Sequence, residues 1–144
     1  MTLDIKQKIL HSSCVVVRTS GVLILGPSGS GKSSLALRLI GLGGTLISDD
    51  RTVLTHRNKH IIATCPKPIQ GRIEARGVGI IKLIPKNFAQ ISLVVDMGSE
   101  GIGRMPKNEK YNLFGVDIPL IRSAPLDAFA EAIYCSVIGS LGRK

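Results

Sequence analysis

The segment Gly26-Pro27-Ser28-Gly29-Ser30-Gly31-Lys32-Ser33 is the strongest indication of the fold, because it matches the Walker A pattern G-x-x-x-x-G-K-S. An apolar run at 22–25 leads directly into it, and leucines follow it at helical spacing over 35–42. A strand, a glycine-rich loop and a helix in that order form the context in which this motif binds phosphate. The sequence therefore predicts a P-loop within an α/β domain.

Each part of this motif has a separate task in the predicted site. Its glycines let backbone N–H groups converge on phosphate oxygens, and the helix that starts near Lys32 adds a positive dipole end. Lys32 is expected to reach the β and γ phosphates, and the Ser33 hydroxyl to ligate magnesium. The expected ligands are therefore ATP and Mg²⁺. The predicted nucleotide-binding residues are Gly26, Pro27, Ser28, Gly29, Ser30, Gly31, Lys32, Ser33 and Ser34.

Composition indicates one layered domain with an aliphatic core. The 144 residues suit a single compact domain over 1–144, and no stretch reads as a linker. Hydrophobic residues make up 44% of the chain but aromatics only 3%, so Val, Ile, Leu and Ala must fill the interior. This composition favours an α/β architecture.

Charge and cysteine usage narrow the choice of partners and compartment. The formal charge of +9 could attract nucleic acid, an acidic protein or phosphorylated molecules. With so few aromatics and no recognisable motif, nucleic-acid binding is not expected. No apolar run reaches the roughly 20 residues that span a bilayer, and the first ten residues lack a signal-peptide pattern. We therefore expect a cytoplasmic protein without membrane contact, and three unpaired cysteines fit that compartment.

Apolar runs and turn residues predict the order of the elements. Strands are expected at 15–17, 22–25, 45–47, 52–55, 60–64, 80–84 and 91–95, and helices at 35–42 and 126–141. The segment PIQGRIEARGVG at 68–79 has no clean period and predicts a shaped loop or short strand. A polar loop is expected over 98–112.

Two adjacent carboxylates, Asp49 and Asp50, follow the apolar strand at 45–47. Such a pair suits phosphoryl transfer, since one carboxylate can hold magnesium while the other takes the proton of an attacking hydroxyl. Asp96, which ends the more hydrophobic run 91–95, is a rival candidate for the magnesium-side carboxylate. The sequence leaves that choice open.

Four features together resemble the catalytic domain of bacterial HPr kinase/phosphorylases. They are His11 before an apolar hairpin, the P-loop GPSGSGKS, the segment LISDD and the segment IEARGVGII at 73–81. The last is the most specific, because it fits the family signature I-E-x-R-G-x-G-I-I nearly residue for residue. The resemblance covers almost the whole chain. It implies a P-loop domain of the phosphoenolpyruvate carboxykinase-like type, with a mixed central sheet and flanking helices.

The same resemblance implies a protein-serine kinase that acts on the phosphocarrier HPr or an HPr-like carrier. Reversal by phosphorolysis, with release of pyrophosphate, is implied as a second activity. Asp49 is preferred as the proton-transferring base and Asp50 as the second member, which also ranks among the metal ligands. The resemblance does not divide the two roles firmly.

Further roles follow by position from the resemblance. His11 would line the active site, Glu74 would assist the metal together with Ser33, and Arg76 would contact phosphate or its acceptor. Arg122 is a candidate for an arginine of a late family loop. The carrier is expected to dock around Arg76 and the loop 98–112.

The chain departs from longer family members, which carry an additional N-terminal domain and a longer C-terminal region. Those members form closed oligomers, so a homo-oligomer is expected here without an identified surface. Two alternatives remain open, a small-molecule P-loop kinase and a non-catalytic nucleotide-sensing module. A GTPase is disfavoured because the N-K-x-D motif is absent.

Overall fold

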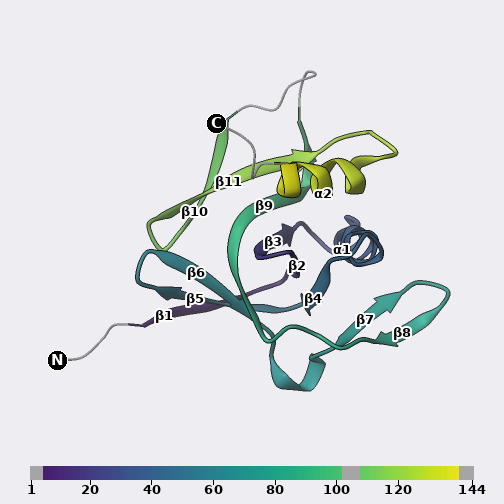
Figure 1. Ribbon diagram of the computed structural model, residues 1–144, viewed down its shortest axis with the longest axis horizontal. Coiled ribbons are helices and arrows are strands. Elements are labelled where there is room, and N and C mark those ends of the chain that lie inside the picture. The colour runs from purple at the N-terminus through teal and green to yellow at the C-terminus, as the bar shows by residue number, and fades with distance from the viewer. Residues whose placement is uncertain (1–4, 102–107, 140–144) are drawn as a thin grey trace.

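The computed structural model describes residues 5–101 and 108–139. Figure 1 shows a strongly curled sheet with two helices packed beside it. In chain order the elements are β1 (Lys6–Leu10), β2 (Ser13–Val17), β3 (Ser20–Leu25), α1 (Lys32–Gly41), β4 (Thr45–Ser48), β5 (Thr52–Arg57), β6 (His60–Thr64), the 3-10 turn η1 (Lys67–Ile69), β7 (Arg72–Ala75), β8 (Gly79–Lys82), β9 (Phe88–Glu100), β10 (Glu109–Leu113), β11 (Val116–Ser123) and α2 (Phe129–Gly139).

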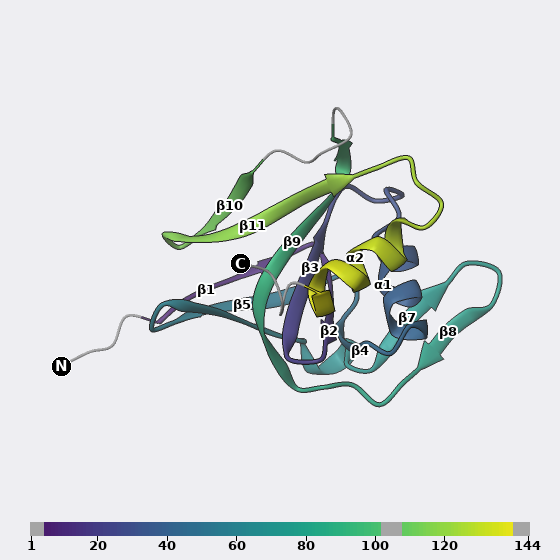
Figure 2. The ribbon, with the colours of Figure 1, turned by 45° about the horizontal axis from the view of Figure 1, so that its top comes forward.

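The main sheet is mixed and is organised around the long strand β9. Its order is β1-β5-β6-β9-β3-β2-β4, and the β10–β11 hairpin adds a further branch through β11. The first residues of β9 pair antiparallel with β6, whereas its later residues run parallel to both β3 and β11. Thus β9 curls from one part of the sheet to the other, as Figure 2 shows. A separate hairpin, β7–β8, projects beyond α1.

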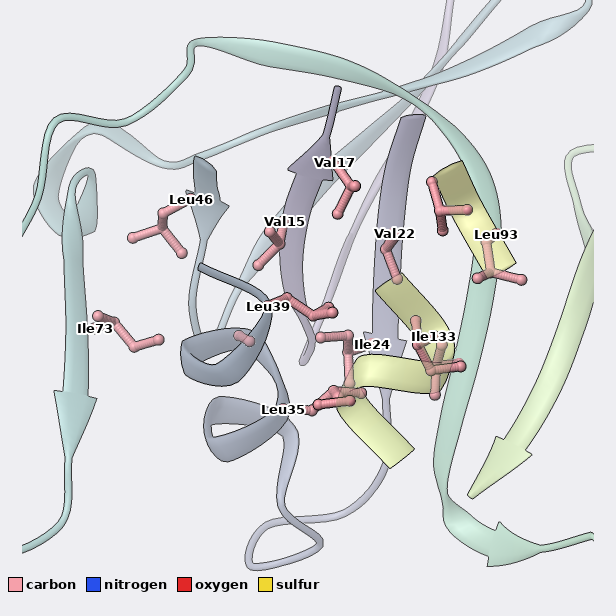
Figure 3. Close-up of a cluster of buried hydrophobic side chains, with 14 residues drawn as sticks. Val15, Val17, Val22, Ile24, Leu35, Leu39, Leu46, Ile73, Leu93 and Ile133 are labelled. Atoms are coloured by element: carbon pink, nitrogen blue, oxygen red, sulfur yellow. The ribbon is translucent and has the colours of Figure 1, made fainter. Parts of the chain in front are cut away.

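Both faces of the central strands are buried, which explains their continuous apolar sequences. Alternate residues of β2, β3 and β9 pack under α1 and α2, and Figure 3 shows Ile24 beside Leu35 of α1 and Ile133 of α2. The opposite face packs against residues of the β5–β6 and β10–β11 hairpins. Both described helices therefore cover one face of the sheet, while the sheet itself closes over the other.

The predicted fold class is confirmed, as are most of the predicted elements. The hairpins β2–β3 and β5–β6 form where the two turn signals placed them. The helix after the P-loop, strand β4 and the run within β9 also agree with the sequence. The C-terminal helix is described only over Phe129–Gly139, a shorter span than the predicted 126–141.

The predicted loop over 98–112 is wrong at both ends. Strand β9 continues to Glu100, and β10 begins at Glu109. These polar residues are strands because β11 supplies backbone partners, with Ser123 opposite Glu100 and Leu120 opposite Glu109. Pairing with a strand that is distant in sequence overrides the weak β-propensity of these polar residues. The sequence of the polar segment alone does not reveal that pairing.

Candidate active site

The P-loop joins the carboxyl end of β3 to the first turn of α1 and has a backbone that requires glycine. Gly26 has φ +146°, and a Cβ there would lie 2.5 Å from the Ser30 hydroxyl oxygen. Gly31 has φ +99° and precedes the first helical residue. Within the described residues the buried Ser30 hydroxyl has no hydrogen-bond partner. A buried unpaired polar atom in a tight glycine-rich loop fits a site that a phosphate completes.

Lys32 lies at the start of α1 and is largely buried. Its Nζ donates to the Gly26 carbonyl oxygen at 2.7 Å and to the Pro27 carbonyl oxygen at 3.0 Å. The ammonium group is therefore held at the start of the P-loop by two backbone carbonyl oxygens. It lines the same cavity as the helix N-terminus, so a phosphate in that cavity meets two positive features.

Asp49 is the inward member of the carboxylate pair and only 8% of it is exposed. Its Oδ1 accepts hydrogen bonds from the Ser33 hydroxyl at 2.8 Å and from the Ser13 hydroxyl at 2.7 Å. Because Ser33 gives its proton to Asp49, an oxygen lone pair of Ser33 stays available for a cation. Asp49 thus contacts Ser33, which lines the cavity, but does not line the cavity itself.

Asp50 is the outward member and adopts the left-handed backbone conformation, with φ +76°. Its Oδ1 lies 2.7 Å from Nε2 of His11, and the side chains of Asp50 and His11 are 63% and 50% exposed. The Asp50 carbonyl also accepts from the Ser12 N–H at 3.1 Å, which fastens the strand beside His11 to this turn. The carboxylate–imidazole pair therefore faces the cavity.

One cavity of about 460 Å³ collects most of the predicted residues. Glu74 and Arg76 reach it from the β7–β8 hairpin, far from the P-loop in sequence. Among the described side chains, neither of these two forms an ion pair within 4.0 Å, so a simple surface salt bridge does not explain them. The residues that line this cavity are His11, Ser28, Gly29, Gly31, Lys32, Ser33, Ser34, Asp50, Glu74 and Arg76.

Asp96, the rival carboxylate, lies in a different environment. It accepts from the Gly98 N–H at 2.8 Å, from the Ser99 hydroxyl at 3.2 Å and from Arg122 Nη1 at 3.3 Å. Arg122 also binds Glu109, and this hydrogen-bonded pairing raises the pKa of the guanidinium. Asp96 and Arg122 therefore form a network at the ends of β9 and β11, outside the cavity lining.

Several buried serine and threonine residues hold the turn that contains Asp49 and Asp50. No sequence pattern singled them out. Ser48 and Thr52 share a hydrogen bond of 2.6 Å, and Thr52 donates to the Ser12 carbonyl at 3.3 Å. Ser13 orients Asp49 directly. Isolated serines and threonines beside strands carry no motif, so only the fold shows that they meet.

The carrier-docking loop predicted at 98–112 lies partly outside the described residues, at 102–107.

Comparisons with known proteins show to which family the chain belongs. Residues 4–123 match the family model described as "HPr Serine kinase C-terminal domain". The chain belongs to this family. An HPr kinase/phosphorylase of Enterococcus faecalis is 36% identical over 126 residues, which cover 82% of this chain and 39% of that protein. One from Lactobacillus johnsonii is 34% identical over 128 residues, covering 80% and 40% respectively. The chain thus spans about two fifths of these curated relatives' length.

The fold is also shared with a solved structure. The HPr(Ser) kinase/phosphatase structure from Coxiella burnetii superposes with a TM-score of 0.77 at 26% identity. The match covers 94% of this chain and 97% of that one. Membership of the HPr serine kinase C-terminal domain family therefore rests on sequence and on fold. None of the helices in the described residues is long and apolar enough to span a membrane.

Proposed function

We propose that this chain is an ATP-dependent kinase that phosphorylates a serine of HPr or an HPr-like phosphocarrier. The observation that carries the proposal is the His11–Asp50 pair facing the P-loop cavity, with Lys32 and Arg76 in the same lining. A proton acceptor and phosphate-binding cations in one cavity are the parts that phosphoryl transfer needs. The names of the curated relatives support the choice of carrier.

The residues present fit Mg²⁺ together with a nucleotide. The described residues contain no group of three or more His, Cys, Asp or Glu side chains able to hold a metal alone. Mg²⁺ commonly takes one or two protein ligands and completes its shell with water and phosphate oxygens. Ser33, which donates a hydrogen bond to Asp49, and Glu74 line the same cavity and offer such a partial set. When bound, Mg²⁺ would offset negative charge on the transferred phosphoryl group.

We propose Asp50, rather than Asp49, as the general base. Asp49 already accepts two hydroxyl hydrogen bonds and is buried, whereas Asp50 faces the cavity. His11 holds Oδ1 of Asp50, which leaves Oδ2 to accept the proton of the carrier serine. As the serine oxygen bonds to the γ phosphorus, the bond to the β-phosphate oxygen breaks and ADP leaves. Lys32 and the helix N-terminus stabilise the charge that develops there.

The reverse reaction follows from the same groups. Inorganic phosphate would occupy the γ position and attack the phosphoserine, and Asp50 would return the proton to the serine oxygen. The products would be the carrier serine and pyrophosphate. The names of the relatives, kinase and phosphorylase together, support this second direction.

We propose that residues 1–144 act as one catalytic domain in the cytoplasm, where the three free cysteines stay reduced. The carrier would dock around Arg76, and the protein would assemble into a homo-oligomer.

Mass spectrometry of the carrier tests the proposed activity. HPr is incubated with the protein, Mg²⁺ and ATP, beside HPr whose acceptor serine is alanine and beside Lys32→Ala protein. The proposal predicts a mass increase of one phosphoryl group that requires both the serine and Lys32. ATP binding without any phosphorylated carrier would instead support a small-molecule kinase or a nucleotide-sensing module.

A further inference from the structure

A second cavity of about 460 Å³ adjoins the first near the start of α1. The two cavities share Gly31 and Ser34, which form the boundary between them. The walls of the second cavity come from α1, the end of β9 and the connection from β11 to α2. Figure 2 shows this connection running beside the loop between β3 and α1. Nothing in the proposed transfer step uses it.

We infer that this second cavity holds the nucleoside, the base and ribose, of the nucleotide. The inference rests on the proposed function, because it needs the phosphate chain to lie on the P-loop. Asp50 and His11 mark the side where the acceptor serine and the terminal phosphate meet. A linear phosphate chain that ends there must leave the loop at its opposite end. Gly31 and Ser34, which line both cavities, connect the phosphate site to the second cavity.

The chemistry of the lining suits a flat, partly polar group. Met97, Leu126 and Phe129 supply apolar surface for the face of a base, while Ser123 and Asp127 supply hydrogen-bonding groups. Leu126 is 53% exposed, and an apolar side chain left open in a cavity wall is what a bound ring would cover. The volume lies within the range of small-molecule sites.

The walls are tied to the phosphate site by α1. Arg38 of α1 donates to the Asp127 carbonyl at 3.4 Å, so the segment that precedes α2 is linked to the helix that carries the P-loop lysine. Backbone hydrogen bonds from Leu126 to Ala124 at 2.8 Å and from Phe129 to Leu126 at 3.0 Å shape the turn that presents Leu126. These hydrogen bonds hold one wall of the cavity against α1.

A tryptophan reporter tests the inference, because the chain contains no tryptophan. In Leu126→Trp protein, Mg²⁺-ATP is expected to change the fluorescence, and Mg²⁺-tripolyphosphate, which lacks a nucleoside, is expected to leave it unchanged. Ile84→Trp is the matched control, since Ile84 is 92% exposed and lines neither cavity. Its fluorescence should respond to neither ligand.

Calorimetric binding provides the second measurement. Leu126→Ser should weaken ATP binding about three- to tenfold through lost apolar contact and leave tripolyphosphate binding unchanged. Ile84→Ser should change neither affinity. If both ligands bind but the Leu126 variants do not distinguish them, the nucleoside lies elsewhere and the P-loop assignment stands. If neither ligand binds the unaltered protein, this inference and the proposed kinase activity both fail.

Discussion

Asp49 and Asp50 are neighbours in sequence but face opposite surroundings. The positive φ of Asp50 turns the chain, so that Asp49 points inward to two hydroxyls and Asp50 points outward to His11. Left-handed backbone is tolerated by aspartate better than by most residues, although it still costs free energy. The backbone bond from Ser12 to Asp50 and the buried Ser48–Thr52 pair hold this turn in place. Local backbone geometry thus separates two chemically identical groups.

The cysteines offer a chemical probe of the same region. Burial, and secondarily the negative charge of Asp49, raises the pKa of the Cys65 thiol to about 11, and burial also raises the pKa of Cys14. A raised thiol pKa leaves little thiolate at pH 8, and the thiolate is the reactive form. With iodoacetamide at pH 8, exposed Cys135 should react first, Cys65 far more slowly and Cys14 only on unfolding.

Rates for each cysteine come from peptide mass spectrometry over a time course. Raising the pH toward 11 should accelerate the reaction of Cys65, since its thiolate population grows through that range. Asp49→Asn should also accelerate it by removing the nearby negative charge. Equal rates for Cys65 and Cys135 at pH 8 would contradict the described burial.

Among the elements, α1 both carries the P-loop and anchors it to the core. Leu39 of α1 is fully buried, whereas Leu42, the residue that caps the end of α1, is 38% exposed. Leu39→Ala should lower the free energy of unfolding by about 2–4 kcal/mol, because it leaves a cavity in the core. Leu42→Ala, the matched control, should cost less than about 1 kcal/mol. Urea denaturation followed by circular dichroism measures both, and similar losses would place Leu39 outside the core.

Elements that carry their own local signal could be predicted from the sequence. The P-loop, the helix behind it and the hairpins β2–β3 and β5–β6 are of this kind, because each is encoded by a local motif, period or turn. Strand β1 was not predictable, since its sequence KQKIL is largely exposed and becomes a strand through pairing with β5. The extension of β9 to Glu100 depends likewise on β11.

The site divides in a similar way. Walker A spacing and the 73–81 segment are sequence features, and they pointed to most of the residues that line the first cavity. The division of roles between Asp49 and Asp50 has no local sequence signal, because the burial of Asp49 and the φ of Asp50 appear only in the fold. The second cavity was equally hidden, since Met97 and Leu126 come from separate elements.

For the whole molecule, the net charge of +9 predicts how it meets its partner. An acidic carrier should be steered toward a basic protein, and salt should screen that attraction. Raising KCl from roughly 50 to 500 mM should lower kcat/KM for the carrier about tenfold. A neutral peptide that contains the acceptor serine is the control and should show a much weaker dependence. Identical salt profiles for both substrates would exclude steering.

Single-turnover phosphorylation of the carrier across a Mg²⁺ titration separates the roles of the two aspartates. Asp49→Asn should raise the Mg²⁺ requirement about tenfold and recover much of its rate at high Mg²⁺, because Asp49 acts through Ser33. Asp50→Asn should lose about 100-fold in rate at every Mg²⁺ concentration while still binding ATP. Recovery of Asp50→Asn by Mg²⁺, with Asp49→Asn inactive throughout, would contradict the assignment and return the role of base to Asp49.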